Sequence, residues 1–139
     1  MTGLVVVSHS RPLADALVAL AKGLIPGLDA PLEVAAGLPD GGLGTDATEI
    51  MAAIERADDG SGVVILADLG SGVLSAQTAL ELLEPELAER VHLSGGALVE
   101  GLVAAYAAAG TGKAPDAVLA DAEAAASLKL RQVAGPPPP

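Results

Sequence analysis

A short aliphatic run near the amino terminus, Leu4 to Val7, limits most strongly what this chain can fold into. Four consecutive aliphatic residues, three of them β-branched, are typical of a strand buried on both faces, and such strands lie inside parallel sheets. The run stops before His9, and Arg11 and Pro12 then favour the start of a helix, with Ser10 as its capping residue. His9 is therefore predicted at the carboxyl end of a central strand, where open α/β sheets bind their ligands.

The rest of the chain alternates between predicted strands and helices. Further strands are predicted at 32–36, 63–67 and 90–94, and helices at 11–26, 46–56, 73–83, 98–110 and 115–130, with a possible short turn of helix at 87–89. This alternation predicts an α/β fold with an open, mostly parallel four-stranded sheet flanked by helices, in one domain of residues 1–131. Residues 132–139 end in four prolines and are expected to form a disordered tail without a role in the core.

Composition excludes several classes of function. A net charge of −11 and a single aromatic residue, Tyr106, argue against nucleic-acid binding, which uses basic patches and stacking rings. Because the chain has no cysteine, it has no disulfides, thiol chemistry or cysteine-ligated metals. Its uncharged runs are shorter than the roughly 18 residues of a membrane span, and the first residues do not resemble a signal peptide. We therefore expect a cytoplasmic protein that binds neither membranes nor nucleic acid.

Of the two histidines, one is predicted at the edge of the sheet. His92 alternates with apolar neighbours inside the fourth predicted strand, which favours a structural or surface role. From its position alone, a structural and a functional role are equally good interpretations of His9. Asp68 favours the functional role, because its carboxylate reaches the ring of His9 if the strands before the two residues are neighbours. Such a carboxylate fixes the tautomer and leaves the opposite ring nitrogen unprotonated and pointing outward as a nucleophile. The alternative for Asp68 is an ordinary turn cap.

Other reaction centres are not indicated by the sequence. It lacks the Gly-x-Ser-x-Gly elbow of hydrolases, the ligand spacing of zinc sites, and the acidic pair that holds magnesium beside a phospho-aspartate, so no metal or cofactor is expected. A bare turn is a better interpretation of the glycine-rich segment 37–44 than a nucleotide-binding loop. Phosphoryl transfer suits a histidine that accepts and hands on a group, because positioning and electrostatic support supply most of its catalysis. The supporting residues that we expect are Ser10, Arg11, Gly44, Thr45, Gly70 and Ser71.

Three segments together resemble a known family of phosphocarriers. They are residues 5–10 (Val-Val-Val-Ser-His-Ser), 44–46 (Gly-Thr-Asp) and 68–79, which begins Asp-Leu-Gly-Ser-Gly-Val-Leu-Ser-Ala. They are similar to the phosphoryl-carrier subunits (DhaM) of bacterial phosphoenolpyruvate-dependent dihydroxyacetone kinases, which have the fold of mannose-type enzyme IIA domains. The likeness runs from Gly3 to about Leu130, and the Gly-Ser-x-x-Leu-Ser-Ala motif distinguishes this branch from relatives in sugar transport.

The resemblance implies a phosphoryl relay. The carrier HPr, charged by enzyme I from phosphoenolpyruvate, would phosphorylate the family's strand-end histidine, here His9, and Asp68 would be the aspartate partner of that histidine. The phosphoryl group would pass to ADP on the kinase's nucleotide-binding subunit, and the rebuilt ATP would phosphorylate dihydroxyacetone on a third subunit. Members of the family are homodimers. Some relatives continue into carrier domains of their own, so this chain is expected to need a separate HPr.

Two other functions remain open at this point. One is an enzyme IIA component of mannose/fructose-type sugar uptake, which would pass the phosphoryl group to a IIB protein. The other is a non-catalytic regulatory module whose pocket at His9 only binds a small anion. A covalent phosphohistidine separates both carriers from the regulatory module, and the identity of the acceptor separates the two carriers.

Overall fold

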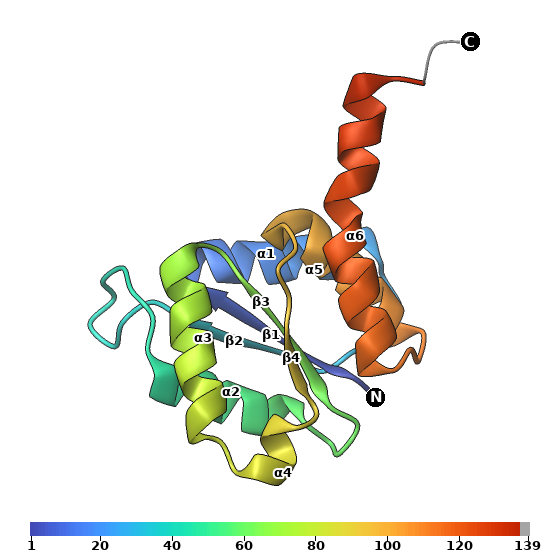
Figure 1. Cartoon of the computed structure of the whole chain (residues 1–139). Helices are drawn as coiled ribbons and strands as arrows, with labels where there is room; N and C mark the ends of the chain where they lie inside the picture. Colours follow the sequence, from blue (N-terminus) through green and yellow to red (C-terminus); the bar gives the residue numbers. More distant parts are fainter. Residues whose placement is uncertain (137–139) are drawn as a thin grey trace.

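Four parallel strands form one sheet in the order β2-β1-β3-β4 in the computed structural model of this chain, which describes residues 1–136 (Figure 1). The strands are β1 (Gly3–Ser8), β2 (Leu32–Ala36), β3 (Val63–Ala67) and β4 (Val91–Leu93). The helices are α1 (Arg11–Leu24), α2 (Ala47–Ala57), α3 (Gly70–Leu82), α4 (Pro85–Ala88), α5 (Leu98–Gly110) and α6 (Pro115–Ala134). The predicted α/β class and the open parallel sheet are confirmed.

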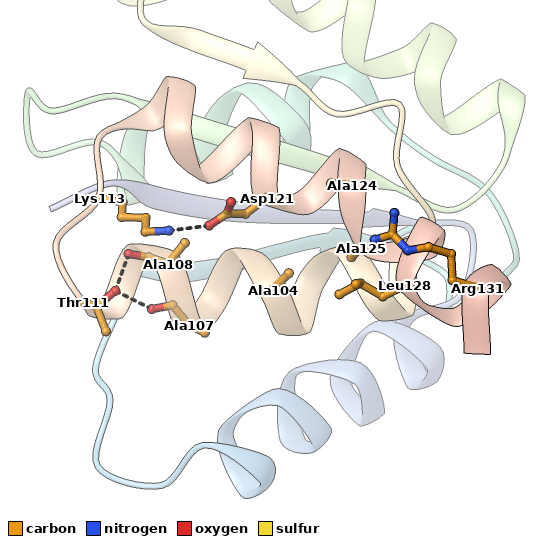
Figure 2. Close-up of a pocket in the computed structure, with 10 residues that line it drawn as sticks. All are labelled: Ala104, Ala107, Ala108, Thr111, Lys113, Asp121, Ala124, Ala125, Leu128 and Arg131. Atoms are coloured by element: carbon orange, nitrogen blue, oxygen red, sulfur yellow. Dashed lines mark hydrogen bonds and ion pairs between the residues drawn. The ribbon is translucent and has the colours of Figure 1, made fainter. Parts of the chain in front are cut away.

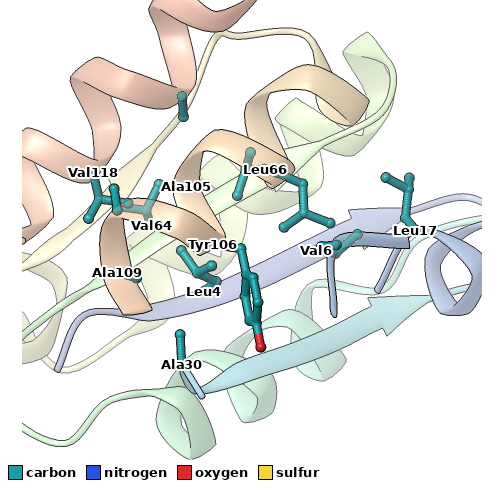
Figure 3. Close-up of a cluster of buried hydrophobic side chains, with 14 of the residues drawn as sticks. Leu4, Val6, Leu17, Ala30, Val64, Leu66, Ala105, Tyr106, Ala109 and Val118 are labelled. Atoms are coloured by element: carbon teal, nitrogen blue, oxygen red, sulfur yellow. The ribbon is translucent and has the colours of Figure 1, made fainter. Parts of the chain in front are cut away.

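Each face of the sheet carries its own apolar layer, because successive residues of a strand point to opposite faces. Leu4 and Val6 of β1 point into a layer formed with α1, α5 and α6, and α5 and α6 lie side by side over this face (Figure 2). Figure 3 shows the same layer, in which the hydroxyl of Tyr106 donates to the carbonyl of Leu28 at 2.6 Å. Val5 and Val7, which alternate with these residues along β1, point into a second layer, against α2 and α3. Burial on both sides explains why the first strand is uninterruptedly aliphatic.

Two helices differ from the sequence prediction. Helix α3 begins at Gly70, three residues before the predicted start, so the Gly-Ser-Gly segment interpreted as a loop forms its first turn. Helix α6 continues to Ala134 rather than ending near Leu130, because residues 131–134 contain no helix breaker and Gly135, with φ of 74°, ends the helix. The expected domain boundary at residue 131 therefore falls inside α6, and residues 137–139 of the expected tail lie outside the described residues.

Within residues 1–136, no helix is long and apolar enough to cross a bilayer.

Candidate active site at the carboxyl edge of the sheet

The pairing of β1 with β3 brings His9 and Asp68 together. Val7 lies opposite Ala67 in the register of the two strands, so both chains leave the sheet at the same level. Nδ1 of His9 lies 2.9 Å from Oδ1 of Asp68. The carboxylate side chain is 10% exposed and the imidazole 24% exposed, so the acid is sheltered while the ring still reaches solvent. The predicted contact between the two strand tips is confirmed.

Asp68 accepts four hydrogen bonds. Its Oδ2 accepts from the Ser8 hydroxyl and from the His9 backbone N–H, both at 2.9 Å. Its Oδ1 accepts from Nδ1 of His9 and from the Leu69 backbone N–H at 2.7 Å. Burial, the largest single influence, raises the pKa of the Asp68 carboxyl, but these hydrogen bonds together outweigh it and hold the pKa below its usual value. The carboxylate is therefore ionised at neutral pH and acts as an acceptor.

An ionised Asp68 determines the tautomer of His9. Because the carboxylate can only accept, Nδ1 carries the proton, and the outer nitrogen Nε2 holds the lone pair. The hydroxyl of Ser71 lies 2.5 Å from Nε2 and donates to that lone pair. The expectation of a bare outward nitrogen is thus modified: the ring does reach solvent, but Ser71 covers its nucleophilic atom. This contact follows from the early start of α3, which places Ser71 in the first helical turn over the ring.

The amino terminus of α3 provides further hydrogen-bond donors at the ring. The first hydrogen bond of the helix runs from the Val73 N–H to the Leu69 carbonyl, so the amides of residues 70–72 precede the helical ladder, and the positive end of the helix dipole lies there. A Cβ built on Gly72 would lie 3.1 Å from Oδ1 of Asp68 and 3.7 Å from Cε1 of His9. Glycine therefore lets this turn approach the histidine and its carboxylate closely.

The loop before α2 is tied to the site at two points. The Gly44 N–H donates to the His9 carbonyl at 2.9 Å. The hydroxyl of Thr45 lies 2.6 Å from that of Ser75 on α3. These two predicted residues therefore hold the loop against His9 and α3. Within residues 1–136, their hydrogen bonds run to backbone or to a serine rather than to the imidazole.

The start of α1 is built as the sequence predicted. The Ser10 hydroxyl caps the helix by accepting from the Leu13 N–H at 3.4 Å. Arg11 reaches sideways, and its Nη1 donates to the Val34 carbonyl on β2 at 3.4 Å. Among the hydrogen bonds of residues 1–136, none joins either side chain to the ring of His9. Both residues lie within two positions of the histidine, but only Ser71 and Asp68 contact its ring nitrogens.

Two further residues of this site, Ser8 and Gly72, are not among those predicted from the sequence. Ser8 is fully buried and donates to Asp68, while its oxygen accepts from the Ser10 N–H at 3.1 Å. The signal for it was a hydroxyl at the last position of an otherwise aliphatic strand. The sequence predicts Gly72 in a loop, whereas its close approach to Asp68 results from its place in the first turn of α3. His92 pairs with Val64 near the start of β3, at the other end of that strand from Asp68, as a structural role predicts.

Four exposed leucines lie on the elements that carry the residues of this site. Leu13 lies in the first turn of α1, Leu43 precedes Gly44, Leu69 precedes α3 and Leu74 lies in its second turn. They are among the exposed large apolar residues of the chain, and the most open of these four leucines, Leu43, is 76% exposed. Exposed apolar side chains on the elements of a reactive site are typical of a surface that another protein covers.

Comparison with known proteins identifies the family. A family model described as "PTS system fructose IIA component" matches residues 3–119. The chain belongs to this family. The match covers every strand, the His9 and Asp68 site, and the chain as far as the first turn of α6.

Curated relatives in the family are phosphoryl donor subunits. The chain is 44% identical over 135 residues to the "PEP-dependent dihydroxyacetone kinase, phosphoryl donor subunit DhaM" of Providencia stuartii, covering 96% of this chain and 28% of that protein. The Escherichia coli K12 protein of the same description is 41% identical, and the match covers 98% of this chain and 29% of that protein. A Listeria innocua relative, described as subunit DhaM of dihydroxyacetone kinase 2, is 37% identical over 73% of this chain and 80% of its own length. The chain thus spans less than a third of the first two relatives.

Solved structures share the fold of this enzyme IIA chain. A protein of unknown function has a TM-score of 0.78 and 32% identity, covering 89% of this chain and 94% of its own. The phosphotransferase system component EIIA from Streptococcus agalactiae has a TM-score of 0.68 and 16% identity, covering 93% and 95%. The fold assigned from the sequence is confirmed by both.

Proposed function

We propose that this chain is the phosphohistidine carrier of a phosphoenolpyruvate-dependent dihydroxyacetone kinase. His9 accepts a phosphoryl group from phospho-HPr and passes it to ADP bound on the kinase's nucleotide-binding subunit. The observation that carries the proposal is the contact of the His9 ring with Asp68: Nδ1 lies 2.9 Å from a carboxylate oxygen that can only accept, which assigns the ring proton to Nδ1 and the lone pair to Nε2. The dihydroxyacetone kinase subunits among the relatives support the choice of acceptor. As the resemblance implies, we also propose that the protein is a cytoplasmic homodimer.

The transfer needs no proton to enter or leave the ring. The Nε2 lone pair of His9 forms a bond to phosphorus, and the bond from phosphorus to the donor nitrogen breaks, returning an electron pair to the donor. The ring then carries a positive charge with its proton still on Nδ1, and the Asp68 carboxylate at 2.9 Å balances that charge. In the second half, an oxygen of the ADP β-phosphate forms the new bond to phosphorus, and the Nε2 bond breaks, which restores the neutral ring.

Ser71 has two successive roles in this scheme. Before transfer, its hydroxyl donates to the Nε2 lone pair. During transfer, the hydroxyl turns to an oxygen of the phosphoryl group, where the amides at the start of α3 also lie. Helix amino termini bind phosphate oxygens through such amides, with support from the helix dipole.

Labelling with the relay proteins tests the proposal. The chain is incubated with enzyme I, HPr and labelled phosphoenolpyruvate, and the expected product is one phosphoryl group that is labile in acid and survives alkali. His9→Ala is expected to abolish labelling, while His92→Ala, which removes the other histidine, is expected to retain it. A wild-type chain that stays unlabelled, or a His9→Ala chain that is still labelled, would overturn the proposal. Intact-mass measurement distinguishes a covalent adduct from the bound anion of a regulatory module.

A sugar-uptake enzyme IIA is the second candidate, favoured by the words "fructose IIA component" in the description of the family model. It shares the first half-reaction and differs in the acceptor. The labelled chain is therefore offered the ADP-loaded kinase subunit and a IIB protein separately. We expect the label to appear in ATP, and transfer to the IIB protein alone would favour sugar uptake.

The exposed leucines on the elements of the site provide a test of protein docking in either case. Leu69→Ser changes a side chain that is 63% exposed next to Asp68, and we expect the KM for phospho-HPr to rise with little change in kcat. Leu82→Ser is the matched control, because Leu82 is 60% exposed at the far end of α3. Equal KM values for the two variants would remove Leu69 from the docking surface.

A further inference from the structure

Thr45 and Ser75 form a hydrogen bond with each other beside the phosphoryl site. Thr45 lies in the loop that leads from β2 into α2, and Ser75 lies on α3 (Figure 1). Their hydroxyls are 2.6 Å apart, and both residues are half-buried. Within residues 1–136, neither hydroxyl bonds to the imidazole, and the transfer described above gives neither a role. An effect of this pair on the reaction must therefore pass through another residue.

Ser71 is the residue through which the pair can act. Ser75 follows it by four positions in α3, and residues four apart lie on one face of a helix, about 6 Å from each other along the axis. The Ser71 hydroxyl lies 2.5 Å from Nε2 of His9. A movement of this part of α3 relative to the loop would change that distance. The position of Ser75 therefore determines how Ser71 meets the ring.

The first turn of α3 has little stability of its own. It contains Gly70 and Gly72, and glycine is a poor helix former. Its N-cap residue is Leu69, whose side chain makes no capping hydrogen bond, so the turn depends on contacts with the rest of the protein. At its start, the Leu69 N–H donates to Oδ1 of Asp68 at 2.7 Å. A second attachment, farther along the helix, is needed to hold the Ser71 hydroxyl over the ring.

The hydrogen bond between Thr45 and Ser75 provides that second attachment. Gly44, the residue before Thr45, donates its N–H to the His9 carbonyl at 2.9 Å. The loop is therefore fixed to the backbone of the same residue whose ring Ser71 contacts. These contacts form a closed circuit, which runs from the His9 backbone through the loop to α3 and returns through Ser71 to the His9 ring.

We propose that Thr45 and Ser75 are positioning residues for the phosphoryl transfer and hold Ser71 in place over Nε2 of His9. This inference rests on the proposed function, in which Ser71 moves its hydrogen bond from Nε2 to an oxygen of the phosphoryl group. The hydrogen bond between Thr45 and Ser75 involves none of the reacting atoms, so it persists during that exchange. It therefore keeps the first turn of α3 at the ring when the contact with Nε2 is lost.

Removal of the two hydroxyls tests the proposal by rapid-quench kinetics with phospho-HPr. We expect Thr45→Val and Ser75→Ala each to lower kcat about three- to tenfold, which corresponds to one lost hydrogen bond. The KM for phospho-HPr is expected to change little, because the exposed leucines of the site are unaltered. The double variant is expected to be no slower than either single variant, since both remove the same hydrogen bond. Thr45→Ser keeps a hydroxyl and is expected to restore most of the rate.

A Ser71→Ala background distinguishes positioning from a general effect on the fold. Without the Ser71 hydroxyl the pair has nothing to position, so we expect Thr45→Val to slow the Ser71→Ala chain by less than about twofold. Thr78→Val is the matched control, because it removes a threonine hydroxyl of α3 that donates only to the Leu74 carbonyl, and it is expected to keep the wild-type kcat.

The nitrogen NMR chemical shift of Nε2 provides a second readout on the unphosphorylated chain, because it changes when a donor to the lone pair is removed. We expect Thr45→Val to move this shift in the same direction as Ser71→Ala does, and Thr78→Val to leave it unchanged. An Nε2 shift that Thr45→Val leaves at its wild-type value would refute the positioning of Ser71.

Three kinetic results would also overturn the inference. A wild-type kcat in Thr45→Val would show that the hydrogen bond has no part in the transfer. A Thr45→Ser chain as slow as Thr45→Val would show that the hydroxyl is not what matters. Equal slowing of the wild-type and Ser71→Ala chains by Thr45→Val would show that the effect does not pass through Ser71. A wild-type chain that is never labelled refutes the carrier function instead, and the Nε2 shift then decides the positioning alone.

Discussion

Replacing Asp68 by asparagine tests how much of the transfer depends on its negative charge. The amide keeps the size of the carboxylate and one acceptor oxygen, but its NH2 group cannot accept from the Ser8 hydroxyl or the His9 N–H, both of which approach Oδ2 at 2.9 Å. The Nδ1 hydrogen bond survives as a neutral one, and the positive ring formed during transfer loses its counter-charge.

The magnitude follows from the contact that changes most during the reaction. A hydrogen bond to a charged group contributes about 1.5–3 kcal/mol, compared with about 1 kcal/mol for a neutral one, so the transition state loses about 1–2 kcal/mol. We therefore expect the rate of phosphorylation from phospho-HPr to fall about 5- to 30-fold at saturating donor. The fold is expected to be retained, because β1 and β3 pair through backbone contacts along five residues each.

Rapid-quench measurement of phospho-His9 formation, with labelled phospho-HPr in excess, determines this rate. Asp116→Asn, an equal change in the first turn of α6, is the control for the general loss of one negative charge. Circular dichroism and thermal unfolding of both variants report on the fold. An Asp68→Asn chain that is phosphorylated as fast as wild type would show that the carboxylate does not stabilise the charged ring.

Two further predictions concern the site and the fold. Gly72→Ala adds a Cβ 3.1 Å from Oδ1 of Asp68, so we expect it to displace the carboxylate and slow labelling of His9 severalfold. Gly70→Ala is the control, because a Cβ at Gly70 meets nothing within 4 Å, and it is expected to label normally. Equal labelling rates for the two variants would refute the role of Gly72. Asp58, whose side chain is 8% exposed, accepts from the Arg90 guanidinium, which holds the pKa of that carboxyl below its usual value. Its contribution to stability is complete above the unfolded pKa of about 3.9 and is lost as pH falls through the lower folded pKa. Asp58→Asn is therefore expected to lower the free energy of unfolding by about 1–2 kcal/mol at pH 7 and by less in acid, measured by urea unfolding under the two conditions. A loss that does not depend on pH would contradict the role of the Asp58 charge.

The sequence predicted the parts of this fold that depend on local pattern. The aliphatic runs of β1 and β3 identify strands buried on both faces, and a hydroxyl before Arg11 and Pro12 identifies the start of α1. Parallel pairing of those strands is then enough to place His9 beside Asp68. These features need only the period of the side chains and the chemistry of the strand ends.

The parts that could not be predicted depend on how helices pack against the sheet. Whether Gly70 and Gly72 belong to a loop or a helix is decided by the space beside Asp68, and the Ser71 contact with Nε2 follows from that decision. The direction of Arg11 toward β2 is likewise set by the neighbouring strand. The length of α6 was underestimated because four residues without breakers precede Gly135 and no amphipathic period marks the end.

The four hydrogen-bond donors around the Asp68 carboxylate also restrict the orientation of the His9 ring. Two of them belong to His9 itself, through its backbone and its ring, so the imidazole cannot rotate to present its outer atom elsewhere without losing the carboxylate. A freely rotating imidazole would let a carrier accept a phosphoryl group on one side of the protein and transfer it on another. A ring held in this way is accessible from one direction only. The phosphoryl donor and the phosphoryl acceptor would therefore compete for the same surface, and an excess of acceptor would slow the rephosphorylation of His9.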